Sequence, residues 1–216
     1  MASAFSHAIL AVAMGKGFQD SVMNWRVLLI GAVCAVLPDF DVIGFYFGIR
    51  YGDLWGHRGM THSLFFASIL SFLLVAILDF KKSKTIVLPH FFYFFICTAS
   101  HGVLDAMTTG GLGVAFFSPF DPTRYFFDFR PIQVSPIGID RFFSVWGFEV
   151  LLSELTWIWV PSALFVGAIA VFKQMEPTPP PMSMNTQTLL DTPVPELPVV
   201  DVERAQQHFV MCWVSR

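Results

Sequence analysis

Charged residues are scarce in this sequence. Asp, Glu, Lys and Arg make up 13% of its 216 residues, whereas 55% are hydrophobic and the mean hydropathy is +0.62. Soluble domains carry roughly 25% charged residues, so the composition argues against a soluble globular domain. It favours an integral membrane protein. The net charge of −3 gives no support for nucleic acid as a partner.

Cysteines are also few and lie far apart, at Cys34, Cys97 and Cys212. This spacing indicates neither a disulfide framework nor a thiolate metal site. The N-terminus lacks the basic stretch of a secretory signal peptide, and His7 interrupts its apolar run. We therefore expect the first apolar segment to remain in the mature protein.

Apolar runs separated by polar or proline-containing stretches predict an all-α integral membrane bundle of about four to five helices. The runs cover residues 4–18, 22–37, 64–78, 86–99 and 141–172. Asp20 or Ser21 is expected to cap the second helix and Pro38 to end it. The lysine-rich turn at 81–84 predicts that the third and fourth helices form an antiparallel hairpin.

Three stretches are expected to be irregular. Residues 42–56 are rich in glycine and aromatic residues and predict a loop or re-entrant segment. Residues 108–140 contain many glycines and prolines, and an irregular stretch of that length is usually a lid or binding loop. We predict a membrane-embedded domain at 1–172 and a proline-rich, disordered tail at 173–216.

Potential metal ligands gather at both ends of the predicted hairpin. The motif His57-Arg58-Gly59-Met60-Thr61-His62-Ser63 precedes its first helix, and His101-Gly102-Val103-Leu104-Asp105 ends its second. His101 and Asp105 are four residues apart and therefore share one helix face. The predicted metal ligands are His7, Asp39, His57, His62, His101 and Asp105.

Imidazole and carboxylate ligands suit zinc, with manganese or iron as alternatives. Six candidates exceed the needs of one tetrahedral ion, so one or two ions are expected. Asp41 is the predicted general base or a carboxylate that orients a ligand. Arg58, Arg124 and Arg130 are candidate phosphate contacts, with ion pairs to Asp121 and Asp128 as the alternative.

The order of these elements resembles the YdjM-type inner-membrane proteins. The resemblance covers about residues 1–172 and rests on His7, Pro38-Asp39-Phe40-Asp41, the His-Arg-Gly-x-Thr-His-Ser motif and His101-x-x-x-Asp105. It implies a membrane-bound, metal-dependent hydrolase. The order is more distantly similar to zinc-dependent phospholipase C and P1 nuclease, which implies attack on a phosphodiester by a metal-activated water. A second His-x-x-x-Asp pair is missing, so a third metal is not expected.

Alternating the helices across a membrane places every lysine on one side and the candidate ligands on the other. The positive-inside rule counts lysines and arginines, and six lie on the lysine side against five arginines on the ligand side. Because those five arginines can pair with acids in the site, the lysine side is predicted to be cytoplasmic. The site would lie on the periplasmic or outer face of a multi-pass inner-membrane protein. His90 falls at the lysine end and is predicted to be interfacial.

These features favour a hydrolase that uses metal-activated water on phosphoesters of lipids or lipid-linked substrates. Three non-catalytic alternatives remain open at this point. They are a metal or proton transporter, a haem-binding bundle that uses His62 and His101, and a scaffold with a structural metal site. Asp105, one turn after His101, has no role in a haem site.

Overall fold

The computed structural model describes residues 1–136 and 139–175. Five main helices form the bundle: α1 (Ala4–Gly15), α2 (Trp25–Val36), α3 (Leu64–Leu78), α4 (Lys84–Ala106) and α7 (Val160–Met175). The shorter elements are η1 (Leu37–Phe47), η2 (Met60–His62), α5 (Ile139–Phe142), α6 (Val145–Glu154) and the π-helical η3 (Leu155–Trp159). Within the described ranges, β structure is limited to two isolated bridges, which confirms the all-α prediction.

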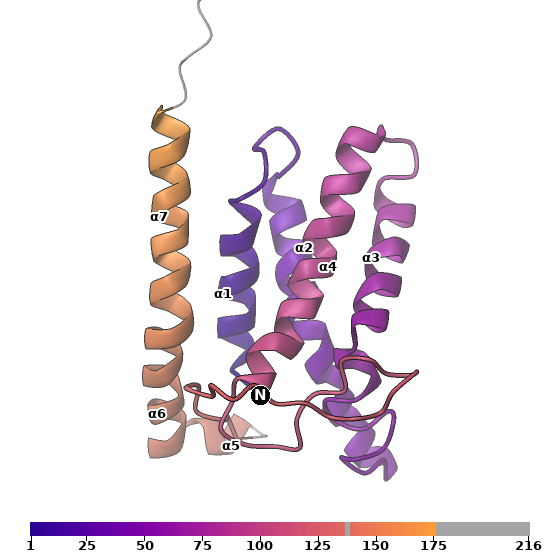
Figure 1. Ribbon diagram of the computed structural model, residues 1–216, viewed down its shortest axis with the longest axis vertical. Helices are drawn as coiled ribbons and strands as arrows, with labels where there is room; N and C mark the ends of the chain where they lie inside the picture. Colours follow the sequence, from indigo (N-terminus) through magenta and orange to yellow (C-terminus); the bar gives the residue numbers. More distant parts are fainter. Residues whose placement is uncertain (137–138, 176–216) are drawn as a thin grey trace, which may run out of the picture. The chain divides into compact units, whose positions relative to one another are not determined.

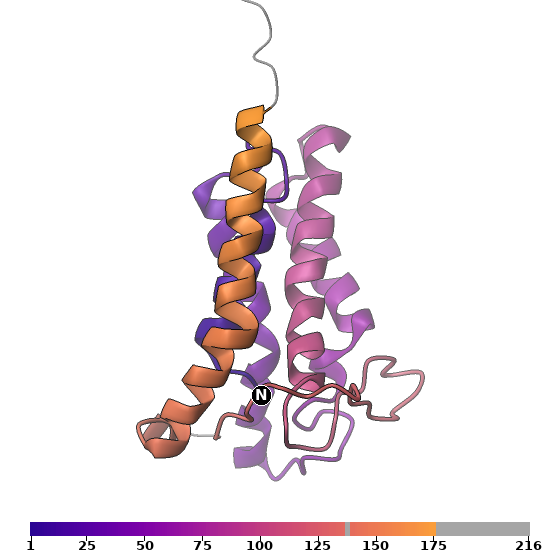
Figure 2. The ribbon, with the colours of Figure 1, turned by 60° about the vertical axis from the view of Figure 1, so that its left-hand side comes forward.

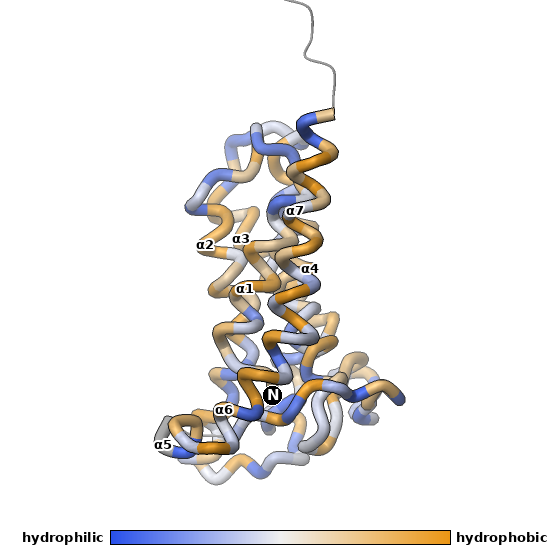
Figure 3. Tube along the Cα trace, turned by 90° about the vertical axis from the view of Figure 1, so that its left-hand side faces the viewer, coloured by the Kyte–Doolittle hydropathy of each residue, from blue (hydrophilic) through white to orange (hydrophobic). Residues whose placement is uncertain are grey.

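Successive helices run in opposite directions, so the connections alternate between two ends of the bundle (Figure 1). Three continuous helical stretches are long and apolar enough to cross a membrane: Trp25–Phe47, Lys84–Ala106 and Val145–Met175. Ala4–Gly15 and Leu64–Leu78 are shorter apolar helices. Most strongly hydrophilic positions lie toward the two ends, with mainly hydrophobic stretches between them (Figure 3).

Helix α4 contacts α1, α2 and α3 and forms the centre of the bundle. The buried Tyr93 lies where α1, α2 and α4 meet, and its hydroxyl donates to the Ala11 carbonyl at 3.1 Å. A Cβ atom added to Gly31 would lie 2.4 Å from the Tyr93 ring, and one on Gly15 would lie 3.1 Å from it. These two glycines therefore permit the close approach of the helices around Tyr93.

Helix α2 differs from its predicted limits at both ends. Its N-cap is Asn24, which accepts hydrogen bonds from Arg26 N and Val27 N; the predicted cap at Asp20 or Ser21 is wrong. Pro38 does not end the helical path, because it enters the first turn of η1, where its missing N–H costs little. The path continues to Phe47 and ends at Gly48, whose φ is 80°. The irregular segment therefore begins at residue 48 instead of 42.

The last apolar segment is a continuous helical path with a local change of pitch. Helix α6 passes through η3 into α7, and Pro161 is the second residue of α7. The helix is therefore not broken near Pro161 as the sequence predicted; a π-helical turn, η3, lies there instead and the helix continues. Figure 2 shows that α7 lies to one side of the α1–α4 bundle. Residues 108–136 form an irregular loop as predicted, although α5 begins at Ile139, inside the predicted stretch 108–140. Residues 173–175 of the predicted tail belong to α7, so the predicted boundary at residue 172 is too early; the rest of the tail, from residue 176 onward, lies outside the described residues.

A buried ionic cluster holds the lysine end of the bundle together. His90 Nδ1 lies 2.6 Å from Asp79 Oδ2, and His90 Nε2 lies 2.9 Å from the Val22 carbonyl. Lys82 also contacts Asp79, at 2.6 Å. His90 lies at the lysine end, where its side chain is buried and joins α4 to the α3–α4 turn and the α1–α2 loop; its interfacial depth in the membrane stays a prediction.

We expect Asp79→Asn to lower the free energy of unfolding by about 3 kcal/mol, because it removes the buried carboxylate charge that contacts Lys82 and His90. For a chain of this size that loss lowers Tm by roughly 6–12 °C. Thermal unfolding in detergent measures the effect. Asp20→Asn is the control, since the Asp20–Lys173 pair is solvent-exposed and should leave Tm unchanged. Equal Tm values for the two variants would show that the buried cluster does not stabilise the bundle.

Candidate metal centre

The end of the bundle opposite the lysines brings four chain segments together. Asp39 and Asp41 come from η1, His57 and Arg58 from the following loop, His62 from η2, and His101 and Asp105 from α4. Gly102 allows the close contact between α4 and η2, because a Cβ there would lie 3.0 Å from the His62 carbonyl oxygen. Residues separated by more than sixty positions thus meet in one buried volume.

Asp39, His62, His101 and Asp105 form the central group, and all four are buried. Each offers one ligand atom, and these atoms lie within 4.8 Å of one another. His101 Nε2 is 3.0 Å from His62 Nε2 and 3.2 Å from Asp39 Oδ1. His62 Nε2 is 3.8 Å from Asp39 Oδ1 and 3.6 Å from Asp105 Oδ2. This group could hold a metal ion.

Hydrogen bonds on the outer side of each ring set the tautomers of the two histidines. His101 Nδ1 lies 2.6 Å from the Ala35 carbonyl, an acceptor, so Nδ1 carries the proton. His62 Nδ1 faces Asp41 Oδ2 at 3.2 Å and Thr61 Oγ1 at 3.0 Å. In their neutral forms, both rings therefore direct an Nε2 lone pair at the same point. Such outer contacts commonly orient metal-binding histidines.

Two lone pairs and two carboxylates facing one another require a cation. A tetrahedral ion bound at about 2.0 Å places its ligand atoms about 3.3 Å apart. The observed separations of 3.0–3.9 Å bracket that value. Both oxygens of Asp39 are buried without a hydrogen-bond partner among the described residues, whereas Oδ2 of Asp105 forms an ion pair with Arg58 Nε at 3.0 Å. The donor set and its spacing therefore fit a small divalent ion.

The carboxylates around His62 also favour a cation at this position. Burial by itself would lower the pKa of His62, but contacts with Asp105, Asp39 and Asp41 outweigh it and raise the pKa to about 10. The carboxylates thus strongly favour positive charge at this position. A proton or a metal ion can supply that charge.

Arg58 is fully buried, and its guanidinium group is fixed by contacts within the protein. Its Nε lies 3.0 Å from Asp105 Oδ2, while Nη1 and Nη2 donate to the Gly110 carbonyl and to Thr108 Oγ1. Its backbone φ is 63°, an unusual conformation for a residue with a side chain. Arg58 therefore holds Asp105 in place and has few donors left for a phosphate.

Asp41 and His57 form a second group with His62. Asp41 accepts hydrogen bonds from His57 Nδ1 at 2.7 Å, Thr61 Oγ1 at 2.7 Å and Arg58 N at 3.2 Å, and it also faces His62 Nδ1. These contacts occupy both carboxylate oxygens. Of the two roles that the sequence left open for Asp41, the geometry favours orienting His62.

His7 lies beside the central group and outside it. Its ring stacks on His101, with 3.8 Å between the ring centroids, and its Nε2 is 3.7 Å from Asp105 Oδ1. Both of its ring nitrogens are buried and have no hydrogen-bond partner among the described residues. His7 is therefore close enough to contact a bound ligand, although it is not one of the four converging residues.

The beginning of the chain takes part in the site, which sequence reasoning missed. Ala2 N donates to Asp105 Oδ1 at 2.9 Å. Glu154 accepts hydrogen bonds from Ser3 N, Ser3 Oγ and Ser6 Oγ. Two buried carboxylates thus fix the first turn of α1, which carries His7. The motif spacing contained no signal for these contacts, because they join residues about 100 to 150 positions apart.

The other two arginines predicted to contact phosphate have different surroundings. Arg124 donates to the backbone carbonyls of His57 at 2.9 Å and Tyr51 at 3.0 Å. Arg130 lies over the Phe126 ring, with its guanidinium carbon 4.8 Å from the ring centroid. Neither forms an ion pair with Asp121 or Asp128 in the part of the chain that is described. Arg124 instead fastens residues 51–57 to the 108–136 loop.

Comparison with known proteins assigns the chain to a family. A family model, YdjM inner membrane protein, matches residues 1–176. The chain belongs to the YdjM inner membrane protein family. It is also 36% identical over 169 residues to inner membrane protein YbcI of Escherichia coli (strain K12), an alignment that covers 78% of this chain and 97% of YbcI. No solved structure matches.

Family membership agrees with the three helices long enough to span a membrane. The chain is therefore an inner membrane protein with a buried histidine–aspartate group that could hold a metal ion. The comparisons give no support to the more distant resemblance to zinc-dependent phospholipase C and P1 nuclease.

We expect detergent-purified protein to contain close to one equivalent of a first-row divalent ion by elemental mass spectrometry. His101→Ala and Asp39→Asn should each remove most of it, because each deletes one converging ligand. Asp121→Asn, at the same end of the bundle but outside the group, should keep the wild-type content. Wild-type metal content in Asp39→Asn would show that Asp39 is not a ligand.

Proposed function

We propose that this protein is a membrane-bound metal-dependent hydrolase that acts on phosphoesters of lipids or lipid-linked molecules. One observation carries the proposal. Asp39, His62 and His101 offer three converging ligand atoms, while the fourth residue of the group, Asp105, is already paired with an arginine. Three protein ligands and one open position are typical of catalytic zinc sites, whereas structural sites use four.

The two carboxylates differ in what neutralises them. Asp39 has no hydrogen-bond donor on either oxygen among the described residues, so its charge is balanced either by protons on the neighbouring imidazoles or by a metal ion. Asp105 accepts from Ala2 N and lies 3.0 Å from Arg58 Nε. Asp39 is therefore the better ligand, and Asp105 is held beside the fourth position, where it can accept a proton.

Zinc suits a site with two imidazoles and one carboxylate, and one ion is sufficient here. When bound, such an ion lowers the pKa of a water toward about 7 and polarises a phosphoryl oxygen. Asp105 would take the proton from the attacking water. Arg58 keeps Asp105 in place and adds positive charge near the phosphate.

The second group, Asp41, His57 and His62, supports the first and does not need an ion of its own. His62 directs Nε2 at the central group, and its Nδ1–H is required for the contact with Asp41. A second ion on Nδ1 would remove that proton. Asp41 and His57 therefore orient His62, as carboxylate partners of zinc-bound histidines do.

The surroundings of the site favour a lipid substrate. Large aromatic side chains are exposed at this end of the bundle, among them Tyr46, Phe47, Trp55 and Phe120. Aromatic residues at the ends of membrane helices mark the boundary between hydrocarbon and water. A phosphoester in a lipid headgroup occupies that same depth. A lipid-linked substrate could therefore reach the site from within the bilayer.

We expect Asp105→Asn to keep most of the metal and to lose at least about a hundredfold in hydrolytic rate, the lower end of a general-base contribution. The rate would be measured on phospholipids and on a chromogenic phosphodiester at equal metal occupancy, with Asp121→Asn as the control. If Asp105→Asn loses its metal as Asp39→Asn does, Asp105 is a fourth ligand and the site is closed. If the metal-loaded wild type hydrolyses no member of the panel, the site is structural.

We further propose that the metal centre faces the periplasm, because all lysines of the described segments lie at the other end of the bundle. In a variant without native cysteines, Ser83→Cys should resist an impermeant thiol reagent in intact cells, and Thr123→Cys should react. Both positions are exposed, so accessibility across the membrane decides the result. The reverse labelling pattern would place the metal centre in the cytoplasm.

A further inference from the structure

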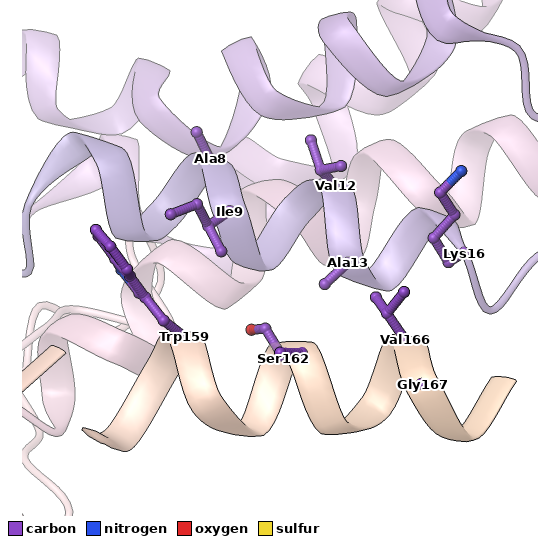
Figure 4. A pocket seen from close by; sticks show the side chains of 10 residues that line it. Ala8, Ile9, Val12, Ala13, Lys16, Trp159, Ser162, Val166 and Gly167 are labelled. Carbon is purple, nitrogen blue, oxygen red and sulfur yellow. The ribbon is translucent and has the colours of Figure 1, made fainter. Parts of the chain in front are cut away.

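An apolar groove of about 700 Å³ lies between α1 and α7, away from the metal centre (Figure 4). Ala8, Val12 and Ala13 line it on α1, and Ala163 and Gly167 line it on α7. These small residues leave space between the two helices. The volume is within the range of pockets that hold small-molecule ligands, about 300–1,000 Å³.

Two polar groups interrupt the apolar lining. Lys16 lies at one end of the groove, which is the lysine end of the bundle (Figure 4). The Ser162 hydroxyl points from α7 toward α1; it is buried and has no hydrogen-bond partner among the described residues. Gly167 lies at the Lys16 end of the groove, and Ser162 lies five residues before it in α7 (Figure 4). Ser162 is therefore about 7.5 Å farther from that end along the helix axis. The groove thus presents a cation at its end and a hydroxyl donor deeper inside.

We propose that this groove binds one anionic glycerophospholipid. Its phosphate would pair with Lys16, and an ester carbonyl, which lies deeper in a bilayer than the phosphate, would accept a hydrogen bond from Ser162. An acyl chain would fill the apolar space between α1 and α7. The order of charge, hydrogen-bond donor and apolar wall along the groove matches the order of these groups in the lipid.

Charge complementarity selects this occupant over others. A transmembrane helix of a second copy would fill the apolar space and offer Lys16 no anion beyond Asp20, which is already paired with Lys173. A zwitterionic lipid would fit the groove but gain less from Lys16. Lys173, at the same end of α7, is already paired with Asp20 at 2.8 Å, so Lys16 is the lysine of the groove itself. The proposal involves no residue of the metal centre and does not depend on hydrolysis.

The experiment is native mass spectrometry of detergent-purified protein exchanged into mixed micelles with phosphatidylglycerol or phosphatidylcholine of identical chains. The wild type should retain phosphatidylglycerol about fivefold more, the effect of one lysine near an anionic surface. Lys16→Gln should abolish the preference. Lys81→Gln, at an exposed lysine of the same end, should keep it. Equal preferences in the two variants would overturn the proposal.

Gly167→Leu tests the groove itself. A Cβ at Gly167 would meet no atom within 4 Å, so the leucine can enter the groove without displacing a neighbour. This variant should keep its Tm and lose retention of both lipids. Unchanged retention in a folded Gly167→Leu protein would show that the lipid binds elsewhere. If this variant fails to fold, the comparison of Lys16→Gln with Lys81→Gln still decides.

An ether-linked phosphatidylglycerol, which lacks the ester carbonyls, tests the contact with Ser162. The wild type should prefer the ester lipid, and Ser162→Ala should bind the ester and ether lipids equally. Persistence of the ester preference in Ser162→Ala would contradict the proposed contact. Lys16→Gln serves as the matched control, because it should weaken both lipids equally and keep the ester preference.

Discussion

The need to neutralise Asp39 and Asp105 within an apolar bundle shapes this protein more than any other interaction. Buried carboxylates are tolerated only when they are paired, hydrogen-bonded or bound to a metal. Asp105 is paired with Arg58 and with the backbone of Ala2, whereas in the described part of the chain Asp39 faces His62 and His101. The positions of η1, η2, the 48–59 loop and the start of α1 all follow from these contacts.

The same principle operates at the opposite end with a different solution. Asp79 is paired there with Lys82 and contacts His90, both of which the chain itself supplies. At the lysine end of α4, the carboxylate is paired with side chains of the same chain. The other end of α4 offers ligands for an added cation. The cluster around Asp79 is therefore structural, whereas the cluster around Asp39 and Asp105, at the other end of α4, is the candidate functional site.

Short-range spacing predicted much of the architecture. The lysine turn indicated the α3–α4 hairpin, and His101-x-x-x-Asp105 indicated two ligands on one face of α4. Other features depend on long-range contacts that spacing does not reveal. Arg58 turns inward because Asp105, Thr108 and Gly110 surround it. His90 is buried because the α1–α2 loop folds over it. Pro38 was expected to end a helix, yet a proline in a first turn is compatible with continuing one.

The hydrogen bonds from Ser3 and Ser6 to Glu154 have a consequence for biosynthesis. Trp159 strengthens this connection by donating to Ser6 Oγ at 2.7 Å. The first turn of α1 gains these hydrogen bonds only after the ribosome has made about 70% of the chain, because Glu154 lies in α6. The four converging residues all precede α6, whereas the contacts that fix His7 beside them form late, so a product that ends before α6 would keep the central group and lack these contacts.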